Sequence, residues 1–111
     1  MSKRKILIVD DDMIAVTLVS ELVKRLGFDF RCALSGEEAM QIIDNSFDTV
    51  ITDMHMFKIN GNDVARHAKE VNSFIRVILC YAPLHTEPET GLFDCIVEKP
   101  VDFSELINAI A

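Results

Sequence analysis

Apolar runs and helix-like periodicities alternate along the whole chain. Residues Ile6–Val9 form one continuous apolar run, which is typical of a strand buried on both faces. Apolar residues then recur at steps of three and four from Leu18 to Leu26, the stripe of an amphipathic helix that ends at Gly27. The same alternation predicts five strands in all: Ile6–Val9, Phe28–Cys32, Thr49–Thr52, Val77–Cys80 and Cys95–Val97.

Helices are predicted between these strands and after the last one. Ser35 and Glu38 have the spacing of a capping box and open one helix, and Asp102 caps another. A third helix follows the loop Asn60-Gly61-Asn62. This order predicts an α/β fold with a doubly wound parallel sheet, wrapped on both faces by right-handed crossovers.

The segment between the fourth and fifth predicted strands breaks the pattern. Residues 82–91 contain Pro83 and Pro88 and no clear apolar stripe. Because a proline costs about 3 kcal/mol inside a helix, at most a short turn is expected there. We therefore expect a degenerate fourth helix, and a short fifth helix because the sequence stops at Ala111.

Composition narrows the class of protein. A length of 111 residues, 50% of them hydrophobic, suits one folded domain over residues 1–111 and argues against disorder. The net charge of −7 argues against direct binding to nucleic acid, which requires clustered Lys and Arg. No apolar run approaches the roughly 20 residues that span a bilayer, and no signal-peptide pattern follows Met1. We therefore expect a cytoplasmic protein with no membrane association.

Charged residues stand at the ends of three predicted strands. Asp10, Asp11 and Asp12 follow the first strand, Asp53 follows the third, and Lys99 follows the fifth. In open α/β sheets, ligands bind beyond the carboxyl ends of the strands, where the strand order reverses. If these strands lie near one another, acids from two of them converge with a lysine from the third.

Such a group of carboxylates favours a divalent cation. Two carboxylates about 4 Å apart repel by about 1 kcal/mol in water and by about 4 kcal/mol at an effective dielectric of about 20. Hard oxygen ligands suit Mg²⁺, which keeps waters that a phosphate can displace. A carboxylate beside Mg²⁺ and a lysine is placed to attack phosphorus, since both cations stabilise the oxygens of the transferring group.

With these motifs in this order, the chain resembles a response-regulator receiver domain, the phospho-accepting half of two-component signalling. The likeness covers essentially the whole chain and implies a flavodoxin-like sheet with strand order 2-1-3-4-5. It rests on Val9-Asp10-Asp11-Asp12, on Asp53-Met54-His55-Met56 with Gly61 downstream, and on Lys99-Pro100, whose peptide bond is commonly cis in the family.

The resemblance implies a role for each motif residue. Asp53 would accept a phosphoryl group from the phosphohistidine of a histidine kinase or phosphotransfer protein. Asp11 and Asp53 would bind Mg²⁺ through their side chains, His55 through its backbone carbonyl, and Asp10 mainly through water. Lys99 would pair first with Asp53 and then with the phosphoryl group. Such a domain catalyses its own phosphorylation and dephosphorylation, is not a dedicated enzyme, and signals to a downstream protein.

Departures from the family pattern affect the expected output. Tyr81 stands where the family has a Thr or Ser, and its hydroxyl lies further from the backbone. Ile96 stands where the family often has a rotating aromatic residue, and Phe57 replaces an expected loop proline. These changes predict intact phosphotransfer with an atypical output switch, in a receiver that signals through another surface or serves as a phosphate relay or sink.

Three alternatives stay open. A degenerate receiver that docks a partner independently of phosphorylation would explain Tyr81 and the weak fourth helix. A haloacid-dehalogenase-type phosphatase would use the spacing of Asp10 and Asp12, although the chain is short for that fold and shows no second acidic pair after a later strand. A flavodoxin-like carrier fits less well, because no Ser/Thr/Gly-rich phosphate loop follows the first strand.

Overall fold

A five-stranded parallel sheet forms the centre of the computed structural model, which describes residues 4–83 and 86–111. Each predicted strand is present, with both ends within one residue of the prediction. The strands are β1 (Lys5–Val9), β2 (Asp29–Ala33), β3 (Thr49–Asp53), β4 (Arg76–Tyr81) and β5 (Cys95–Glu98). The helices are α1 (Met13–Arg25), α2 (Gly36–Ile42), α3 (Gly61–Val71) and α4 (Phe103–Ile110).

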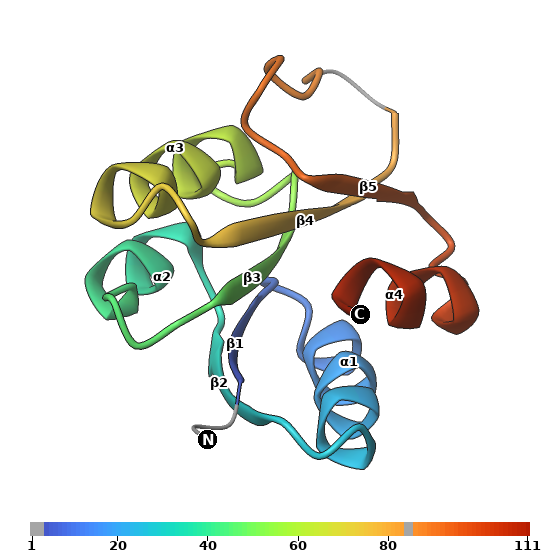
Figure 1. The fold of residues 1–111 in the computed structure, drawn as a ribbon. Coiled ribbons are helices and arrows are strands. Elements are labelled where there is room, and N and C mark those ends of the chain that lie inside the picture. Colours follow the sequence, from blue (N-terminus) through green and yellow to red (C-terminus); the bar gives the residue numbers. More distant parts are fainter. Residues whose placement is uncertain (1–3, 84–85) are drawn as a thin grey trace.

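The strand order β2-β1-β3-β4-β5 confirms the predicted doubly wound sheet. All four neighbouring pairs of strands run parallel. Helices α2 and α3 cover one face of the sheet, and α1 and α4 cover the other (Figure 1). Because the crossovers place helices on both faces, β1, β3 and β4 are buried along nearly their whole lengths.

Two apolar layers hold the helices on the sheet. Alternate residues of β1 point to opposite faces, so Leu7 lies in the layer beneath α2 and α3, while Ile8 lies in the layer beneath α1 and α4. Residues Ile6–Val9 are at most 2% exposed, which confirms the prediction of a strand buried on both faces. Each such side chain contributes roughly 1.5–3 kcal/mol by its burial, so the sheet is a firm support for residues at its ends.

Short polar side chains begin the helices. Asp102 caps α4, as predicted. Ser35 Oγ accepts a hydrogen bond from the Glu38 amide at 3.0 Å, which is one half of the predicted capping box. The reciprocal box forms at α3, where the side chains of Asn60 and Asp63 each accept from the other residue's amide. These caps satisfy amides that the first turn of a helix leaves unpaired.

Residues 82–94, termed the β4–β5 segment, contain no helix in their described part, 82–83 and 86–94. The predicted loss of the fourth helix is thereby confirmed, and α4 is the short helix that was expected as the fifth. The side chain of Asn62 in α3 holds this segment: its Nδ2 donates to the Glu87 carbonyl at 3.0 Å, and its Oδ1 accepts from the Glu89 amide at 2.9 Å. Arg66 of α3 also pairs with the Glu89 carboxylate.

Two arginines from distant parts of the chain complete the last turn of α4. Arg4 Nη1 donates to the Ile110 carbonyl at 2.6 Å, and Arg76 Nη2 donates to the Ala109 carbonyl at 2.9 Å. The end of a helix leaves such carbonyls without partners and carries partial negative charge. The guanidinium groups supply both hydrogen bonds and positive charge there.

Candidate functional site

The carboxyl ends of β1 and β3 lie side by side, because these strands are neighbours in the sheet. Asp10 follows β1 directly, and Asp53 is the last residue of β3. β5 is separated from β3 by β4, yet Lys99 at its end reaches across: Lys99 Nζ is 2.8 Å from Asp53 Oδ1 and 3.9 Å from Asp10 Oδ2. The Lys99–Pro100 peptide bond is cis.

Asp11 completes a group of three carboxylates. Asp10, Asp11 and Asp53 each offer one oxygen, and these oxygens all lie within 4.8 Å of one another. Asp10 and Asp53 are 7% and 6% exposed, whereas Asp11 is exposed. Together with Lys99, these residues form what we term the acidic hollow, which has buried walls and a side open to solvent.

The charges of the acidic hollow do not balance. Burial raises the pKa of Asp10 to about 6 and the charge of Asp53 acts in the same direction, against the opposing effects of the Asp12 amide and Lys99. Burial lowers the pKa of Lys99, but the hydrogen bond and charge of Asp53, together with Asp10, outweigh it and leave that pKa above its ordinary value. Three carboxylates therefore face one fixed ammonium, and excess negative charge remains when all are ionised.

The donor chemistry of the acidic hollow fits Mg²⁺. This ion takes hard oxygen ligands, binds one or two carboxylates and retains several waters. Two buried carboxylates and one exposed carboxylate offer such ligands, and a divalent cation compensates the excess negative charge. The one group of potential metal ligands found within the described ranges contains neither Cys nor His side chains, which softer metals prefer. The backbone carbonyl of His55 remains a predicted further ligand.

Asp12 belongs to α1 rather than to the acidic hollow. Its Oδ1 accepts from the Ile14 amide at 2.9 Å, as an N-cap residue does. Its own amide donates to Asp10 Oδ1 at 2.9 Å and so helps to orient that carboxylate. A phosphatase that pairs Asp10 with Asp12 would need the Asp12 carboxylate for chemistry, whereas here it caps a helix.

Two glycines let the loop between β3 and α3 pack closely beside Asp53. A Cβ on Gly61 would lie 2.7 Å from the Asp53 carbonyl oxygen, and a Cβ on Gly36 would lie 2.5 Å from Ile59 Cγ2. A side chain at either position would therefore displace the loop that carries the acid. Gly61 is part of the family resemblance, but no pattern in the sequence indicates Gly36, because its contact joins two separate elements.

His55 connects the same loop to the start of the β4–β5 segment. Its Nε2 lies 3.0 Å from the Ala82 carbonyl oxygen, and its ring stacks on Tyr81 at an interplanar angle of 27° with the centroids 6.3 Å apart. The tautomer with hydrogen on Nε2 donates this bond. Tyr81 is half-buried, and its carbonyl accepts from the Lys99 amide at 2.9 Å. His55 and Tyr81, which were predicted to have different roles, thus contact each other. No spacing in the sequence indicates this contact.

A doubly wound sheet of this order, with acids from two strand ends facing a lysine from a third, defines the receiver class of α/β domains. The chain belongs to the response regulator receiver domain family, whose family model matches residues 6–111.

Curated relatives agree with this assignment. The chain is 33% identical over 107 residues to the transcriptional regulatory protein ZraR of Escherichia coli, a match that covers 91% of this chain and 24% of that protein. It is 31% identical over 109 residues to the transcriptional regulatory protein CpxR of the same organism, covering 96% of this chain and 47% of CpxR. The chain therefore spans about a quarter of the length of ZraR and about half of the length of CpxR.

Solved structures show the same fold. A response regulator receiver domain protein from Clostridium thermocellum is 28% identical, with a TM-score of 0.82 over 96% of this chain and 90% of that one. A CheY-like receiver domain protein from Methanospirillum hungatei is 22% identical, with a TM-score of 0.84 over 98% of this chain and 91% of that one. The second likeness concerns the fold alone.

Proposed function

We propose that this chain is a single phospho-accepting receiver domain, in which Asp53 receives a phosphoryl group from the phosphohistidine of a histidine kinase or phosphotransfer protein. The observation that carries the proposal is the acidic hollow, where Lys99 Nζ lies 2.8 Å from Asp53 Oδ1 beside three clustered carboxylates. Membership of the receiver family supports it. In this role the chain is a phospho-acceptor that assists its own reaction, not a dedicated enzyme.

Asp53 acts as the nucleophile in this proposal. A carboxylate oxygen bonds to phosphorus while the bond from phosphorus to the imidazole nitrogen breaks, and the electron pair of that bond stays on the imidazole, which takes up a proton. Lys99 holds the Asp53 carboxylate before the transfer and stabilises the phosphoryl oxygens after it. Strands β3 and β5 both pair with β4, and this pairing holds the Asp53 carboxylate and the Lys99 amine in fixed positions relative to each other.

The remaining residues of the acidic hollow would hold Mg²⁺. Asp11 and Asp53 would bind through their carboxylates, His55 through its carbonyl, and Asp10 mainly through water. When bound, the ion supplies positive charge beside the transferring oxygens. A pKa of about 6 leaves Asp10 mostly ionised near neutral pH even before a cation favours its charged form further.

Large apolar side chains surround the mouth of the acidic hollow and suit a protein donor. An open cavity of about 370 Å³ is lined by Asp10, Asp12 and Lys99 and by apolar residues that include Leu18 of α1 and Phe103 of α4. Leu18 and Phe103 in this lining are 51% and 43% exposed, and Ile14 nearby in α1 is 72% exposed. An apolar surface next to reactive acids favours docking of another protein over a small polar donor.

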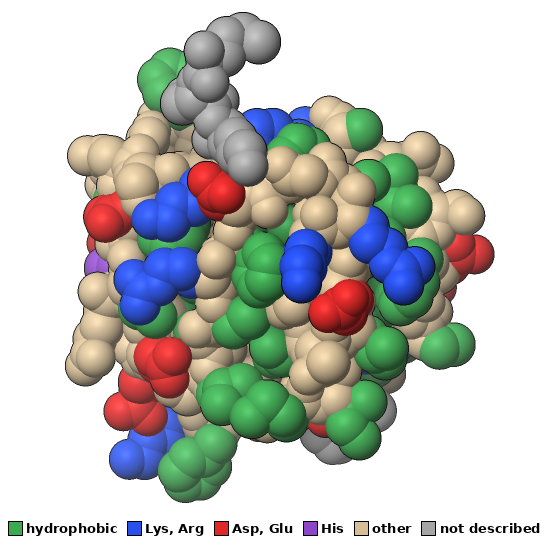
Figure 2. All heavy atoms as spheres, turned by 90° about the horizontal axis from the view of Figure 1, so that it is seen from below, with side chains coloured by type: hydrophobic (Ala, Val, Ile, Leu, Met, Phe, Trp, Pro, Cys, Tyr) green, Lys and Arg blue, Asp and Glu red, His purple; other side chains and the backbone are tan. Residues whose placement is uncertain are grey.

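The output of this receiver is proposed to be atypical and to act on a protein partner in the cytoplasm. Tyr81 stands where a shorter hydroxyl is expected, and the described part of the β4–β5 segment forms no helix. The net charge is −7, and on the face that Figure 2 shows, Lys and Arg side chains are dispersed among acidic and apolar ones, which supports a receiver domain that does not itself bind nucleic acid directly. No helix within residues 4–83 and 86–111 is long and apolar enough to cross a bilayer.

Incubation with acetyl phosphate and Mg²⁺, read by intact mass, tests the proposal. We expect one phosphoryl adduct, lost with EDTA and absent from Asp53→Asn. Asp12→Asn is the matched control: asparagine caps a helix as well as aspartate, and Asp12 lies outside the acidic hollow, so the adduct should persist. A wild-type chain that gains no adduct from acetyl phosphate or a phosphohistidine donor would instead indicate a phosphorylation-independent docking module.

A further inference from the structure

β5 is covered on one face only. On the side of α1 and α4, Val97 is 3% exposed, whereas on the opposite side Ile96 is 50% exposed. Parallel strands are normally covered on both faces, because the crossover helices pack over them. The described part of the β4–β5 segment supplies no such helix, so apolar surface of β5 faces water.

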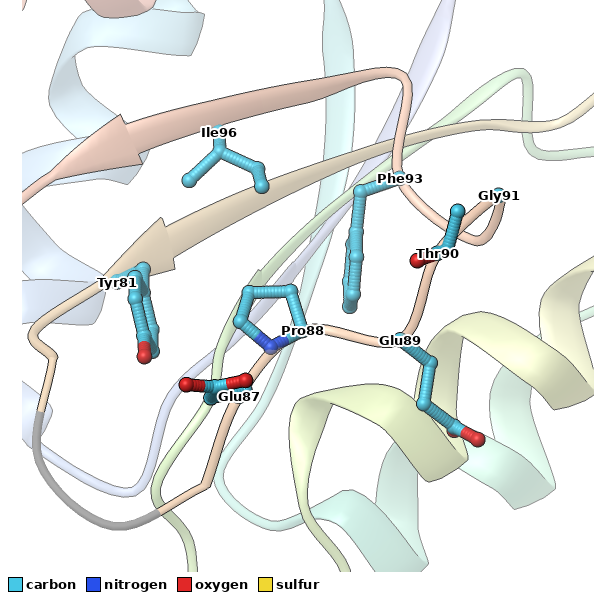
Figure 3. Close-up of a pocket in the computed structure, with 8 residues that line it drawn as sticks. All are labelled: Tyr81, Glu87, Pro88, Glu89, Thr90, Gly91, Phe93 and Ile96. Atoms are coloured by element: carbon cyan, nitrogen blue, oxygen red, sulfur yellow. The ribbon is translucent and has the colours of Figure 1, made fainter.

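A hollow of about 440 Å³, termed the β5 groove, lies over this uncovered face. Figure 3 shows the rings of Tyr81, Pro88 and Phe93 together with the Ile96 side chain around the groove. Glu87, Glu89, Thr90 and Gly91 complete the lining, so the groove has an apolar part and a polar part. The volume lies within the roughly 300–1,000 Å³ that ligand pockets usually have, enough to admit a bulky side chain.

Contacts with α3 keep the β5 groove open. Asn62 binds the backbone at Glu87 and Glu89, and Lys69 Nζ donates to Asp94 Oδ2 at 2.9 Å. Asp94 Oδ2 also accepts a hydrogen bond, at 2.8 Å, from the amide of Val77 near the beginning of β4. These bonds hold Glu87, Glu89 and Asp94 in the arrangement that leaves the β5 groove open.

The rim of the β5 groove is negative. The Glu89 carboxylate is paired with Arg66, but Glu87 and Glu98, both exposed, have no cation within ion-pair distance in the part of the chain that the structure describes. Glu98 follows Ile96 by two residues and so points to the same face of β5. An apolar floor between two unpaired carboxylates complements an apolar side chain flanked by cations.

We propose that the β5 groove docks a segment of a partner protein that carries one bulky apolar side chain between Lys or Arg residues. The apolar side chain enters between Tyr81 and Ile96, and the flanking cations pair with Glu87 and Glu98. The segment thereby supplies from another chain the cover that β5 lacks. The proposal stands apart from phosphotransfer, because the groove includes none of the acids or the lysine of the acidic hollow.

Three synthetic peptides test the proposal by NMR with isotope-labelled Asp53→Asn protein, in which docking is separated from phosphorylation. The first peptide has a central phenylalanine with two Lys or Arg residues on each side, the second replaces the phenylalanine by serine, and the third replaces the cations by glutamates. We expect the first peptide to shift the amides of Tyr81 and of residues 86–98 and no others. The other two should bind at least about tenfold more weakly, as loss of an anchor or of charge complementarity does.

Matched variants locate the binding site. Ile96→Glu should weaken binding of the first peptide about tenfold, whereas Phe74→Glu, at an exposed apolar position outside both the β5 groove and the acidic hollow, should not change it. Ile96→Ala adds no charge and gives a second measurement if the glutamate disturbs folding, which thermal melting of each variant checks. No shifts up to about 1 mM peptide, shifts centred on α1 or on the acidic hollow, or equal losses in the Ile96 and Phe74 variants would overturn the proposal.

Discussion

Replacing Asp10 by asparagine should stabilise the domain when magnesium is absent. Burial raises the pKa of Asp10 from its ordinary value of 3.8 to about 6 in the folded chain. An acid whose pKa is higher in the folded state than in the unfolded state opposes folding once it is ionised in both. This cost is absent below pH 3.8, grows as the pH rises towards 6, and is complete above that value.

The size of the effect follows from the two pKa values. The difference between 3.8 and about 6 corresponds to about 3 kcal/mol at 1.36 kcal/mol per unit. Because the acidic hollow opens to water, which screens the charge, we expect a smaller effect. Asp10→Asn should raise the free energy of unfolding by about 1–3 kcal/mol near pH 7.5. Asparagine keeps an oxygen that can accept from the Asp12 amide, so that bond is not lost. At pH 5, where most folded wild-type chains carry a proton on Asp10, the gain should shrink by up to about 1.4 kcal/mol.

Urea unfolding in EDTA at both pH values, followed by circular dichroism, measures the gain. Saturating Mg²⁺ should reduce or reverse it, because the wild-type chain is stabilised by binding the ion and the variant lacks one charge of the acidic hollow. Asp12→Asn is again the control and should change stability little. An Asp10→Asn chain no more stable than wild type at pH 7.5, or an identical gain at both pH values, would refute the electrostatic reasoning.

Three further substitutions test the supports of the site. Gly61→Ala should destabilise the fold by about 1–3 kcal/mol in urea and weaken Mg²⁺ binding in calorimetry, since its Cβ would meet the Asp53 carbonyl oxygen at 2.7 Å; wild-type values in both assays would contradict the close packing. Asn62→Ala should cost about 1–3 kcal/mol and speed hydrogen exchange at the Glu89 amide, which loses its partner; unchanged protection there would mean that other contacts hold the β4–β5 segment. Asp102→Ala should lower stability by about 1 kcal/mol through loss of the α4 cap, and an unaltered melting temperature would argue against that role.

The strands were predictable because their signal is local, whereas their order in the sheet was implied by the family resemblance. Ile6–Val9 and the other apolar runs need no information from distant residues, and alternation with helices leaves few ways to connect them. Helix starts were predicted less well. Ser35 and Glu38 have the spacing and residue types of a capping box but form only one of its two hydrogen bonds. Asn60 and Asp63 form both bonds, although the usual capping box has Ser or Thr at the first position and Glu or Gln at the second.

The acids and the lysine of the site were predictable for a different reason. Each stands at the end of a strand, where this class of sheet collects its ligands, so their position along the sequence implies their position in space. Gly36, the His55 imidazole and the Asn62 side chain had no such signal. Their roles depend on contacts with Ile59, Ala82 and the β4–β5 segment, which arise only when separate elements pack together.

The arginine contacts at the end of α4 have a consequence for the order of folding. A helix of eight residues is marginal by itself, so α4 depends on what surrounds it. Arg4 precedes Ile110, whose carbonyl it binds, by 106 residues, and Arg76 precedes Ala109 by 33 residues. Contacts across such separations form only after long stretches of chain have closed. The last turn of α4 is therefore complete only in molecules whose β1 and β4 have already found their places, which makes it a late structure on the folding pathway.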